Sequence, residues 1–130
     1  MLEQYLGTRK LTPGNHRLKY PSKKMGMHLA TESPNEFNFA EFLEADSRVR
    51  GFISQPQTIT YDLYQIGHQY TADFLVDFYI FKPTFYEIKP KGFEMSEEEE
   101  DKFYEIEKTF NDMDFNFILV TGDYIEKGLV

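Results

Sequence analysis

The stretch that decides the fold is residues 69–81, QYTADFLVDFYIF, together with residues 84–89, TFYEIK, which follow it after Lys82-Pro83. Both segments are rich in Phe, Tyr, Val and Ile, the residue types that favour β-strands, and alternate residues over 74–80 are apolar and share one face. Lys82-Pro83 is typical of a turn. The pattern predicts one long strand over residues 69–81 and a second over 84–89 that pairs with it as a hairpin.

Signals on either side of this pair predict the remaining elements. Ser33 is suited to cap a helix, the proline that follows it is suited to the first helical position, and Glu36 stands at the third. This order predicts a helix over residues 34–46. An amphipathic pattern predicts a second helix over 96–113. Further strands are predicted over residues 49–54, 58–63 and 115–121, with a turn at Gly67. The order α-β-β-β-β-α-β predicts an α/β fold whose central mixed β-sheet is flanked by helices.

Length and composition exclude several classes of protein. The chain has 130 residues, a common length for one domain, and no cysteine, which excludes disulfides, thiol nucleophiles and thiolate zinc sites. No stretch of about 18 uncharged apolar residues is present, and the first residues lack the pattern of a signal peptide. We therefore expect no membrane partner and an intracellular, cytoplasmic protein, with viral origin or association with a virion as the alternative.

Charge is distributed unevenly along the chain, whose formal net charge is −8. Residues 1–28 carry six basic side chains and one acidic one, and Gly and Pro interrupt them repeatedly. We expect a basic N-terminal arm over residues 1–30, followed by a single domain over residues 31–130. Such an arm suits a polyanion such as DNA, although an extended, solvated tail has the same composition.

Acidic residues concentrate in the second predicted helix, in the run 97–101. Ser96 and Glu99 have the spacing of a capping box, and acidic side chains near a helix N-terminus interact favourably with the helix dipole. The run is then an ordinary solvated helix start. The alternative interpretation is an acidic face that repels DNA or mimics it.

Three acidic residues and a lysine form the candidate chemical site. Asp73 lies early in the long predicted strand, and Glu87 and Lys89 share one face of the next strand. A hairpin of matched register brings these three side by side, and Glu36 adds a third carboxylate if the first helix packs across the sheet. Carboxylates without a His or Cys cluster favour Mg²⁺ or Mn²⁺, and such an ion supports phosphodiester hydrolysis.

Each of these residues also has an ordinary structural interpretation. Glu36 alone would be the capping-box glutamate of its helix. Asp73 would be a charge at a strand edge, and Glu87 with Lys89 an exposed ion pair. The order of all four along the chain is more specific than any one of them.

This order resembles the PD-(D/E)XK nuclease superfamily, and within it the N-terminal catalytic domain of the TnsA-type transposon endonucleases. The resemblance covers about residues 21–92 and includes Ser33-x-x-Glu36, Gln55-Pro56, Tyr70-Thr71-x-Asp73-Phe74 and Glu87-x-Lys89-Pro90. It implies a nuclease-like core in which Glu36, Asp73 and Glu87 are the acids of the metal site and Lys89 is the catalytic lysine. It also implies cleavage of duplex DNA with Mg²⁺ or Mn²⁺. Gln55 matches a recurrent position of the family, and its role is left open.

Two features depart from the family pattern. Ala72 stands where proline is usual, and a full transposon endonuclease carries a further C-terminal domain for its transposase partners, whereas this sequence stops at Val130. Small standalone phage nucleases that resolve DNA junctions or complete heads are similar in the same four catalytic positions. The resemblance therefore implies a role in DNA transposition and recombination or in phage DNA processing.

In this hypothesis Asp73 and Glu87 hold the ion, the main-chain carbonyl of Ile88 adds a ligand, Glu36 supports a second ion or a water, and Lys89 assists the attacking water. Basic side chains would contact the DNA, with the acidic helix facing away. These are Arg9, Lys10, Arg17, Lys19, Lys23 and Lys24 along the arm, and Lys91 near the scissile phosphate.

The overall acidity of the chain predicts that a partner protein or a homo-oligomer supplies further affinity for duplex or branched DNA. No organic cofactor is expected. The rival hypothesis is a noncatalytic structural or assembly module, for example in a phage virion or a recombination complex, that uses the same fold. A DNA mimic would explain the acidic run but not the ordered acids and lysine.

Overall fold

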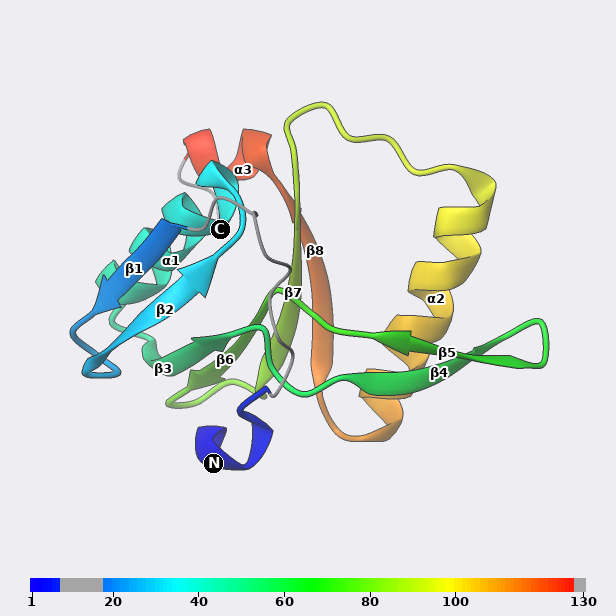
Figure 1. Ribbon diagram of the computed structural model, residues 1–130, viewed down its shortest axis with the longest axis horizontal. Helices are drawn as coiled ribbons and strands as arrows, with labels where there is room; N and C mark the ends of the chain where they lie inside the picture. The colour runs from blue at the N-terminus through cyan, green and yellow to red at the C-terminus, as the bar shows by residue number, and fades with distance from the viewer. Residues whose placement is uncertain (8–17, 128–130) are drawn as a thin grey trace.

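A computed structural model describes residues 1–7 and 18–127 of the chain (Figure 1). Along this part, helices and strands alternate irregularly. Their order is η1 (Leu2–Tyr5), β1 (Leu18–Ser22), β2 (Met27–Thr31), α1 (Pro34–Ala45), β3 (Val49–Ser54), β4 (Ile59–Leu63), β5 (Ile66–Tyr70), β6 (Phe74–Phe78), β7 (Thr84–Lys89), α2 (Glu97–Asp112), β8 (Asn116–Thr121) and α3 (Gly122–Lys127).

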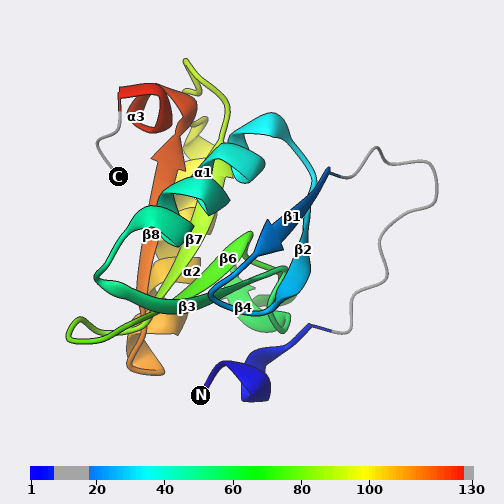
Figure 2. The same ribbon diagram turned by 90° about the vertical axis from the view of Figure 1, so that its left-hand side faces the viewer.

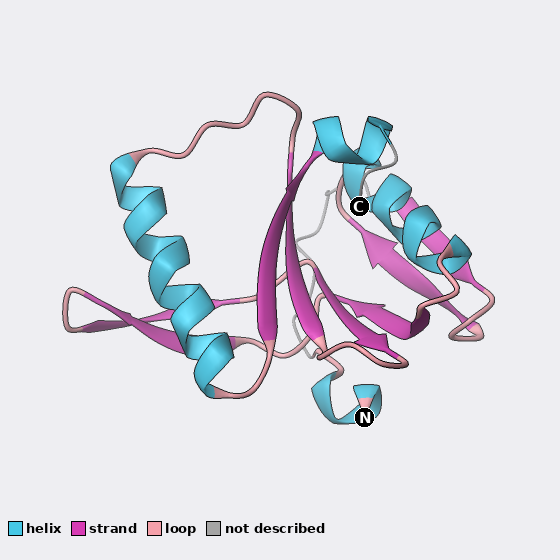
Figure 3. Cartoon of the chain, turned by 180° about the vertical axis from the view of Figure 1, so that it is seen from behind, coloured by secondary structure: helices cyan, strands magenta, loops and turns pink. Residues whose placement is uncertain are grey.

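Four strands form the central sheet in the order β3-β6-β7-β8 (Figure 3). β6 pairs antiparallel with β3 and with β7, whereas β8 runs parallel to β7. A parallel pair needs a crossover connection, and α2 supplies it. The predicted α/β class with a mixed central sheet is therefore confirmed.

Helices cover both faces of this sheet and divide the core into two clusters (Figure 2). α2 contributes Phe103 and Phe110 to one cluster, and α1 contributes Phe39 to the other. Successive side chains of a strand point to opposite faces, so Phe85 of β7 joins the α2 cluster and Ile88 joins the α1 cluster. The same alternation decides which face the candidate site residues of β7 occupy.

Both predicted helix starts are present. The Ser33 hydroxyl accepts a hydrogen bond of 3.1 Å from the Glu36 amide, with Pro34 as the first helical residue. Ser96 and Glu99 form a complete capping box at the start of α2. These caps satisfy amide groups that have no partner within the helix, which explains why both helices begin where the sequence predicts.

The prediction of one long strand over residues 69–81 is wrong. The structure divides the segment into β5, which pairs only with β4 in a separate hairpin, and β6, which belongs to the central sheet. The hairpin turns at Tyr64 and Gln65, whose φ angles are 52° and 66°, so Gly67 lies within β5 and is not the turn. Residues 71–73 connect the β4–β5 hairpin to the central sheet, where the main-chain amide of Asp73 donates a hydrogen bond of 2.9 Å to the Tyr86 carbonyl of β7.

Part of the predicted N-terminal arm is folded. β1 and β2 form an antiparallel hairpin that packs Tyr20 and Leu29 against α1, and η1 buries Leu2 against the other core cluster. Arg9, Lys10 and Arg17 lie outside the described residues. The sequence pattern missed this hairpin because its basic, Gly- and Pro-containing composition is equally typical of a solvated tail.

The last helix, α3, was not predicted, because it follows β8 directly and is only six residues long. It packs against α1 on the same face of the sheet. None of the helices in the described part of the chain is long and apolar enough to cross a membrane.

Candidate functional site

The structure brings Asp73 and Glu87 together on adjacent strands. β6 and β7 pair through Phe74 and Tyr86, and Asp73, one residue before β6, continues that register opposite Glu87. The Ile88 amide donates a 2.7 Å hydrogen bond to Asp73 Oδ2. Asp73 is thus bound to β7 through both its main chain and its carboxylate.

Glu87 lies on the α2-facing side of β7 and is held there by a tyrosine. The Tyr70 hydroxyl at the end of β5 donates a hydrogen bond to Glu87 Oε1. The Glu87 side chain is 12% exposed, and Oε2 lies 3.8 Å from the ammonium of Lys89. Burial and the neighbouring Glu87 charge raise the pKa of Tyr70 above its usual range, so the hydroxyl remains a donor.

Lys89 shares this face with Glu87, as the two-residue spacing predicts. Its ammonium lies 5.0 Å from the ring centre of Phe93 and 5.7 Å from that of Phe103. Both rings attract a cation placed over their faces. One quarter of the Lys89 side chain is exposed, so the charge is held by aromatic rings on one side and reaches solvent on the other.

Glu36 lies at the first turn of α1 and is 6% exposed. Its Oε1 accepts a hydrogen bond of 3.2 Å from the Glu32 amide, and its Oε2 accepts one of 3.4 Å from the Ser33 hydroxyl. Glu36 thus interacts with its own helix start, but its side chain accepts from the Glu32 amide and the Ser33 hydroxyl and not from the Ser33 amide, as the glutamate of a capping box would. Glu36 also lies close enough to Glu87 and Asp73 for their charges to interact.

The shared burial of these acids changes their protonation. Burial and the charges of Glu32 and Glu87 raise the pKa of Glu36 to about 7. The hydrogen bonds from Glu32 and Ser33 lower this pKa but do not offset the rise. Burial and the charges of Glu87 and Glu36 raise the pKa of Asp73 well above its usual range. Carboxylates held together in low dielectric repel one another, and a proton or a cation relieves that repulsion.

The oxygen donors fit a hard divalent ion, although the arrangement is not a complete cation cage. In the described residues no group of three or more Asp, Glu or His side chains surrounds a single point, because Glu36 turns both oxygens toward its own helix start. Asp73 and Glu87 are the two acids that the β6–β7 register places side by side. The amide and carbonyl of one strand residue point to the same side, so the Ile88 carbonyl is directed toward Asp73, as its amide is.

Gln55, whose role the sequence left open, is buried at the end of β3 with a positive φ of 48°. The main-chain amide of Gln55 donates a hydrogen bond of 3.0 Å to the main-chain carbonyl of Asp73. On the other side, a Cβ at Gly7 would lie 2.0 Å from the Gln55 carbonyl oxygen, so only glycine fits there. The Gln55 main chain therefore links the N-terminal segment to the Asp73 loop.

The predicted DNA-contacting residues are not equivalent. Lys19 and Lys23 are exposed on the β1–β2 hairpin, and Lys91 is exposed just after β7. Lys24 differs, because its ammonium donates to three main-chain carbonyls at the C-terminal end of α1 and the start of β3. Its assignment as a DNA contact is corrected to a structural one, since those carbonyls use its three donors.

The acidic helix does not face away from the candidate site. α2 covers the face of the sheet to which Glu87 and Lys89 point. Glu99 of this helix lies near enough to Lys89 that the lysine charge contributes to lowering the pKa of Glu99. In Figure 1 the β1–β2 hairpin and α2 lie on opposite sides of β7.

Three aromatic residues of the site were missed as functional neighbours by sequence reasoning. Tyr70 lies within one of the quoted motifs, but the sequence assigns it no role. Phe93 and Phe103 follow in the next loop and helix, where aromatic residues are typical of a core. Only the packing of β5 and α2 on β7 brings these rings to Glu87 and Lys89.

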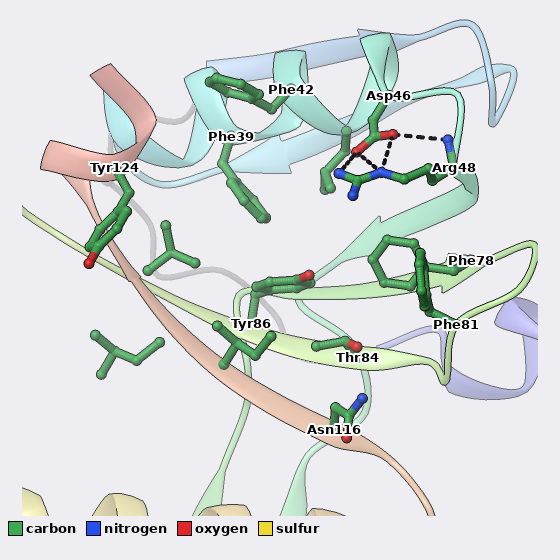
Figure 4. A pocket seen from close by; sticks show the side chains of 14 residues that line it. Phe39, Phe42, Asp46, Arg48, Phe78, Phe81, Thr84, Tyr86, Asn116 and Tyr124 are labelled. Atoms are coloured by element: carbon green, nitrogen blue, oxygen red, sulfur yellow. Dashed lines mark hydrogen bonds and ion pairs between the residues drawn. The ribbon is translucent and has the colours of Figure 1, made fainter. Parts of the chain in front are cut away.

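A cavity of about 550 Å³ lies on the opposite, α1-facing side of the sheet (Figure 4). None of the sequence-predicted site residues lines it. The Asp46–Arg48 ion pair, with its 2.6 Å contact, lies at its wall. Aromatic rings make up much of the lining, from Phe39, Phe42, Phe78, Phe81, Tyr86 and Tyr124.

No protein-family model matches the chain, and no curated protein matches it either.

Proposed function

We propose that the protein is a metal-dependent DNA endonuclease of the PD-(D/E)XK type, which hydrolyses phosphodiester bonds in DNA transposition, recombination or phage DNA processing. The observation that carries this proposal is the convergence of Asp73, Glu87 and Lys89 at the junction of β6 and β7. Half-buried acids held side by side by the β6–β7 pairing, next to a half-buried lysine, are an arrangement that costs folding stability and serves cation chemistry.

The ion would be Mg²⁺ or Mn²⁺, held by one carboxylate oxygen of Asp73, one of Glu87 and the Ile88 carbonyl. When bound, it neutralises phosphate charge and lowers the pKa of a coordinated water. In the reaction the water oxygen would bond to phosphorus and lose a proton to solvent, while one phosphorus–oxygen ester bond breaks and the departing oxygen takes up a proton from solvent. Lys89 orients the water or offsets the negative charge that develops on the phosphate.

Glu36 has a supporting role in this proposal. Its carboxylate accepts from Glu32 and Ser33, so it is positioned by its own helix start. Its charge still acts on Asp73. Glu36 would therefore hold a water or a second ion rather than the first.

DNA would reach the site across the end of β7, past the exposed Lys91, and the exposed Lys19 and Lys23 of the β1–β2 hairpin would contact its backbone beyond the site. The acidic first turn of α2 limits approach from the side of that helix, because its charges repel phosphate. This one-sided charge supports the expectation that a partner protein or a second copy supplies further affinity.

The test is cleavage of supercoiled plasmid and of branched DNA with Mg²⁺ or Mn²⁺. Wild type should cut, whereas Asp73→Ala and Lys89→Ala should lose activity by at least about a hundredfold. Asp62→Ala on β4 and Lys82→Ala beside β7 are matched controls, since both residues are exposed and outside the site, and they should retain activity. Absence of cutting by wild type with either ion on both substrates would overturn the proposal.

A noncatalytic assembly module is the second candidate, and the α1-facing surface favours it. β8 is an edge strand, and Ile118 on it is 45% exposed beside the aromatic cavity. An apolar edge strand is a template for pairing with another chain. Light scattering of wild type and Ile118→Glu tests this candidate: an oligomer lost in the variant, together with absence of DNA cleavage, would support it.

A further inference from the structure

We propose that Tyr70 is a positioning residue of the candidate metal site, whose hydroxyl fixes the Glu87 carboxylate so that Oε2 remains on the side of Lys89. This inference rests on the proposed function. It goes further in assigning a role to a residue of β5, an element outside the central sheet that carries the acids.

The first step is the position of the tyrosine. Tyr70 is the last residue of β5 and is 8% exposed, and the chain passes from it through Thr71 and Ala72 to Asp73. The residue that holds Glu87 is thus only three positions from the other proposed ligand. A shift of β5 would move both acids of the site.

The second step is the rigidity of the ring. Three phenylalanines surround Tyr70 with their rings edge-on, at centroid distances of 6.0–6.4 Å. Edge-to-face contacts of this kind are favourable and directional. The ring is therefore fixed by α2 and β8, through Phe103, Phe110 and Phe117, and the hydroxyl has one defined direction.

The third step is what the hydroxyl does to the carboxylate. Oε1 of Glu87 accepts the Tyr70 hydrogen bond, and Oε2 lies 3.8 Å from Lys89 Nζ. A carboxylate can accept about four hydrogen bonds or ligands, so this contact leaves capacity for an ion. Partners that orient metal-binding side chains in this way typically change metal affinity about 10- to 100-fold when they are removed.

The fourth step separates positioning from packing. If Tyr70 only fills the core, phenylalanine serves equally, because the ring contacts remain. If the hydroxyl positions Glu87, phenylalanine keeps the packing and loses metal affinity. The two roles therefore differ in one measurable quantity, the dissociation constant of the ion.

The experiment is a Mn²⁺ titration of the full chain, followed by the electron paramagnetic resonance signal of free Mn²⁺. Tyr70→Phe should weaken binding about tenfold. Tyr86→Phe is the matched control, because this hydroxyl lies one residue from Glu87 but on the opposite face of β7, at the cavity. It should leave the affinity unchanged, and Glu87→Gln should abolish binding.

A second variant guards against simple destabilisation. Phe117→Leu loosens the same aromatic cluster but keeps the hydroxyl, so it shows what loss of packing alone does to Mn²⁺ affinity. All titrations are made below the onset of melting of the least stable variant, as followed by circular dichroism. Equal affinity of wild type and Tyr70→Phe, or an equal loss in Phe117→Leu, would overturn the positioning role alone. Absence of Mn²⁺ binding by wild type would overturn the proposed function and, with it, this inference.

Discussion

The main-chain amide of Ile88 donates a 2.7 Å hydrogen bond to the Asp73 carboxylate, so the residue between Glu87 and Lys89 is tied directly to the acid on the neighbouring strand. This bond forms where the β6–β7 ladder ends. The Asp73 side chain therefore accepts a hydrogen bond from β7 just beyond the last main-chain pair of β6 and β7. Together with the main-chain bond from the Asp73 amide to the Tyr86 carbonyl, this bond holds Asp73 against the strand that carries Glu87 and Lys89.

Asp73→Asn should stabilise the protein when no metal is bound. Asparagine keeps an oxygen acceptor for the Ile88 amide but removes a carboxyl group whose pKa is raised in the folded protein by burial and by the charges of Glu87 and Glu36, and whose protonation at this pH costs folding free energy. At pH 8 with chelator present, we expect the free energy of unfolding in urea to rise by about 2 kcal/mol. The exposed Asp62→Asn on β4 should change it by less than about 0.5 kcal/mol. A less stable Asp73→Asn would contradict the assigned electrostatics.

Stability of the metal-free protein should fall as pH rises toward neutrality. The pKa of Glu36 is about 7 in the folded protein and near its ordinary value of 4.5 when unfolded. Its contribution is therefore fully present below pH 4.5 and is lost as pH rises through about 7. The shift corresponds to roughly 3 kcal/mol.

Urea denaturation at pH 5 and pH 7.5 checks this dependence. Glu36→Gln should flatten the fall, because the amide does not titrate, whereas Glu41→Gln, exposed on the same helix, should not. Mn²⁺ at pH 7.5 should restore stability in wild type. An identical pH dependence in Glu36→Gln and wild type would count against the burial of the Glu36 charge.

Lys24→Met should destabilise the fold rather than weaken DNA binding selectively. Its ammonium donates to the carbonyls of Leu43, Asp46 and Val49 at 2.9, 2.6 and 2.8 Å. Loss of these bonds should lower the free energy of unfolding by about 1–3 kcal/mol. Lys23→Met is the matched control, since Lys23 is exposed, and equal stability of the two variants would refute the capping role of Lys24.

Phe103→Leu should slow DNA cleavage, because it removes an aromatic ring that holds the Lys89 ammonium. The ring centre lies 5.7 Å from the ammonium, and a half-buried cation–π contact is worth about 1 kcal/mol, which corresponds to a fall in rate of roughly fivefold. Phe110→Leu removes a ring of the same helix and core cluster, and in the described part of the chain the cation–π contacts of Lys89 are with Phe93 and Phe103 instead. If both variants lose the same activity at equal metal affinity, packing alone explains the effect.

Charge reversal on the β1–β2 hairpin should weaken DNA binding in a salt-dependent way. Lys19→Glu with Lys23→Glu removes two exposed cations, so the slope of log affinity against log salt should fall by about 2. Lys108→Glu, exposed on α2, should have little effect, because that helix is already acidic. Fluorescence anisotropy over a salt series measures both slopes; equal slopes would place the DNA elsewhere.

The sequence by itself determined the elements whose signals are local. Caps at Ser33 and Ser96 predicted both main helices, since a cap depends on residues within one helical turn. Alternation correctly predicted that Glu87 and Lys89 share a face and that Ile88 points away from it. The spacing also indicated that Asp73 lies beside Glu87.

Only the tertiary structure decided the rest. Whether residues 69–81 form one strand or two depends on which neighbour each half pairs with, and period-two patterning carries no information about the partner. The same limit hid the role of Tyr70, whose hydroxyl reaches Glu87 only because β5 and β7 meet in space. Lys24 looked like a surface cation for the same reason: the carbonyls that bind it lie about twenty residues away in the chain. Local chemistry specifies where elements begin and which way side chains alternate, whereas long-range packing decides which charged groups face one another.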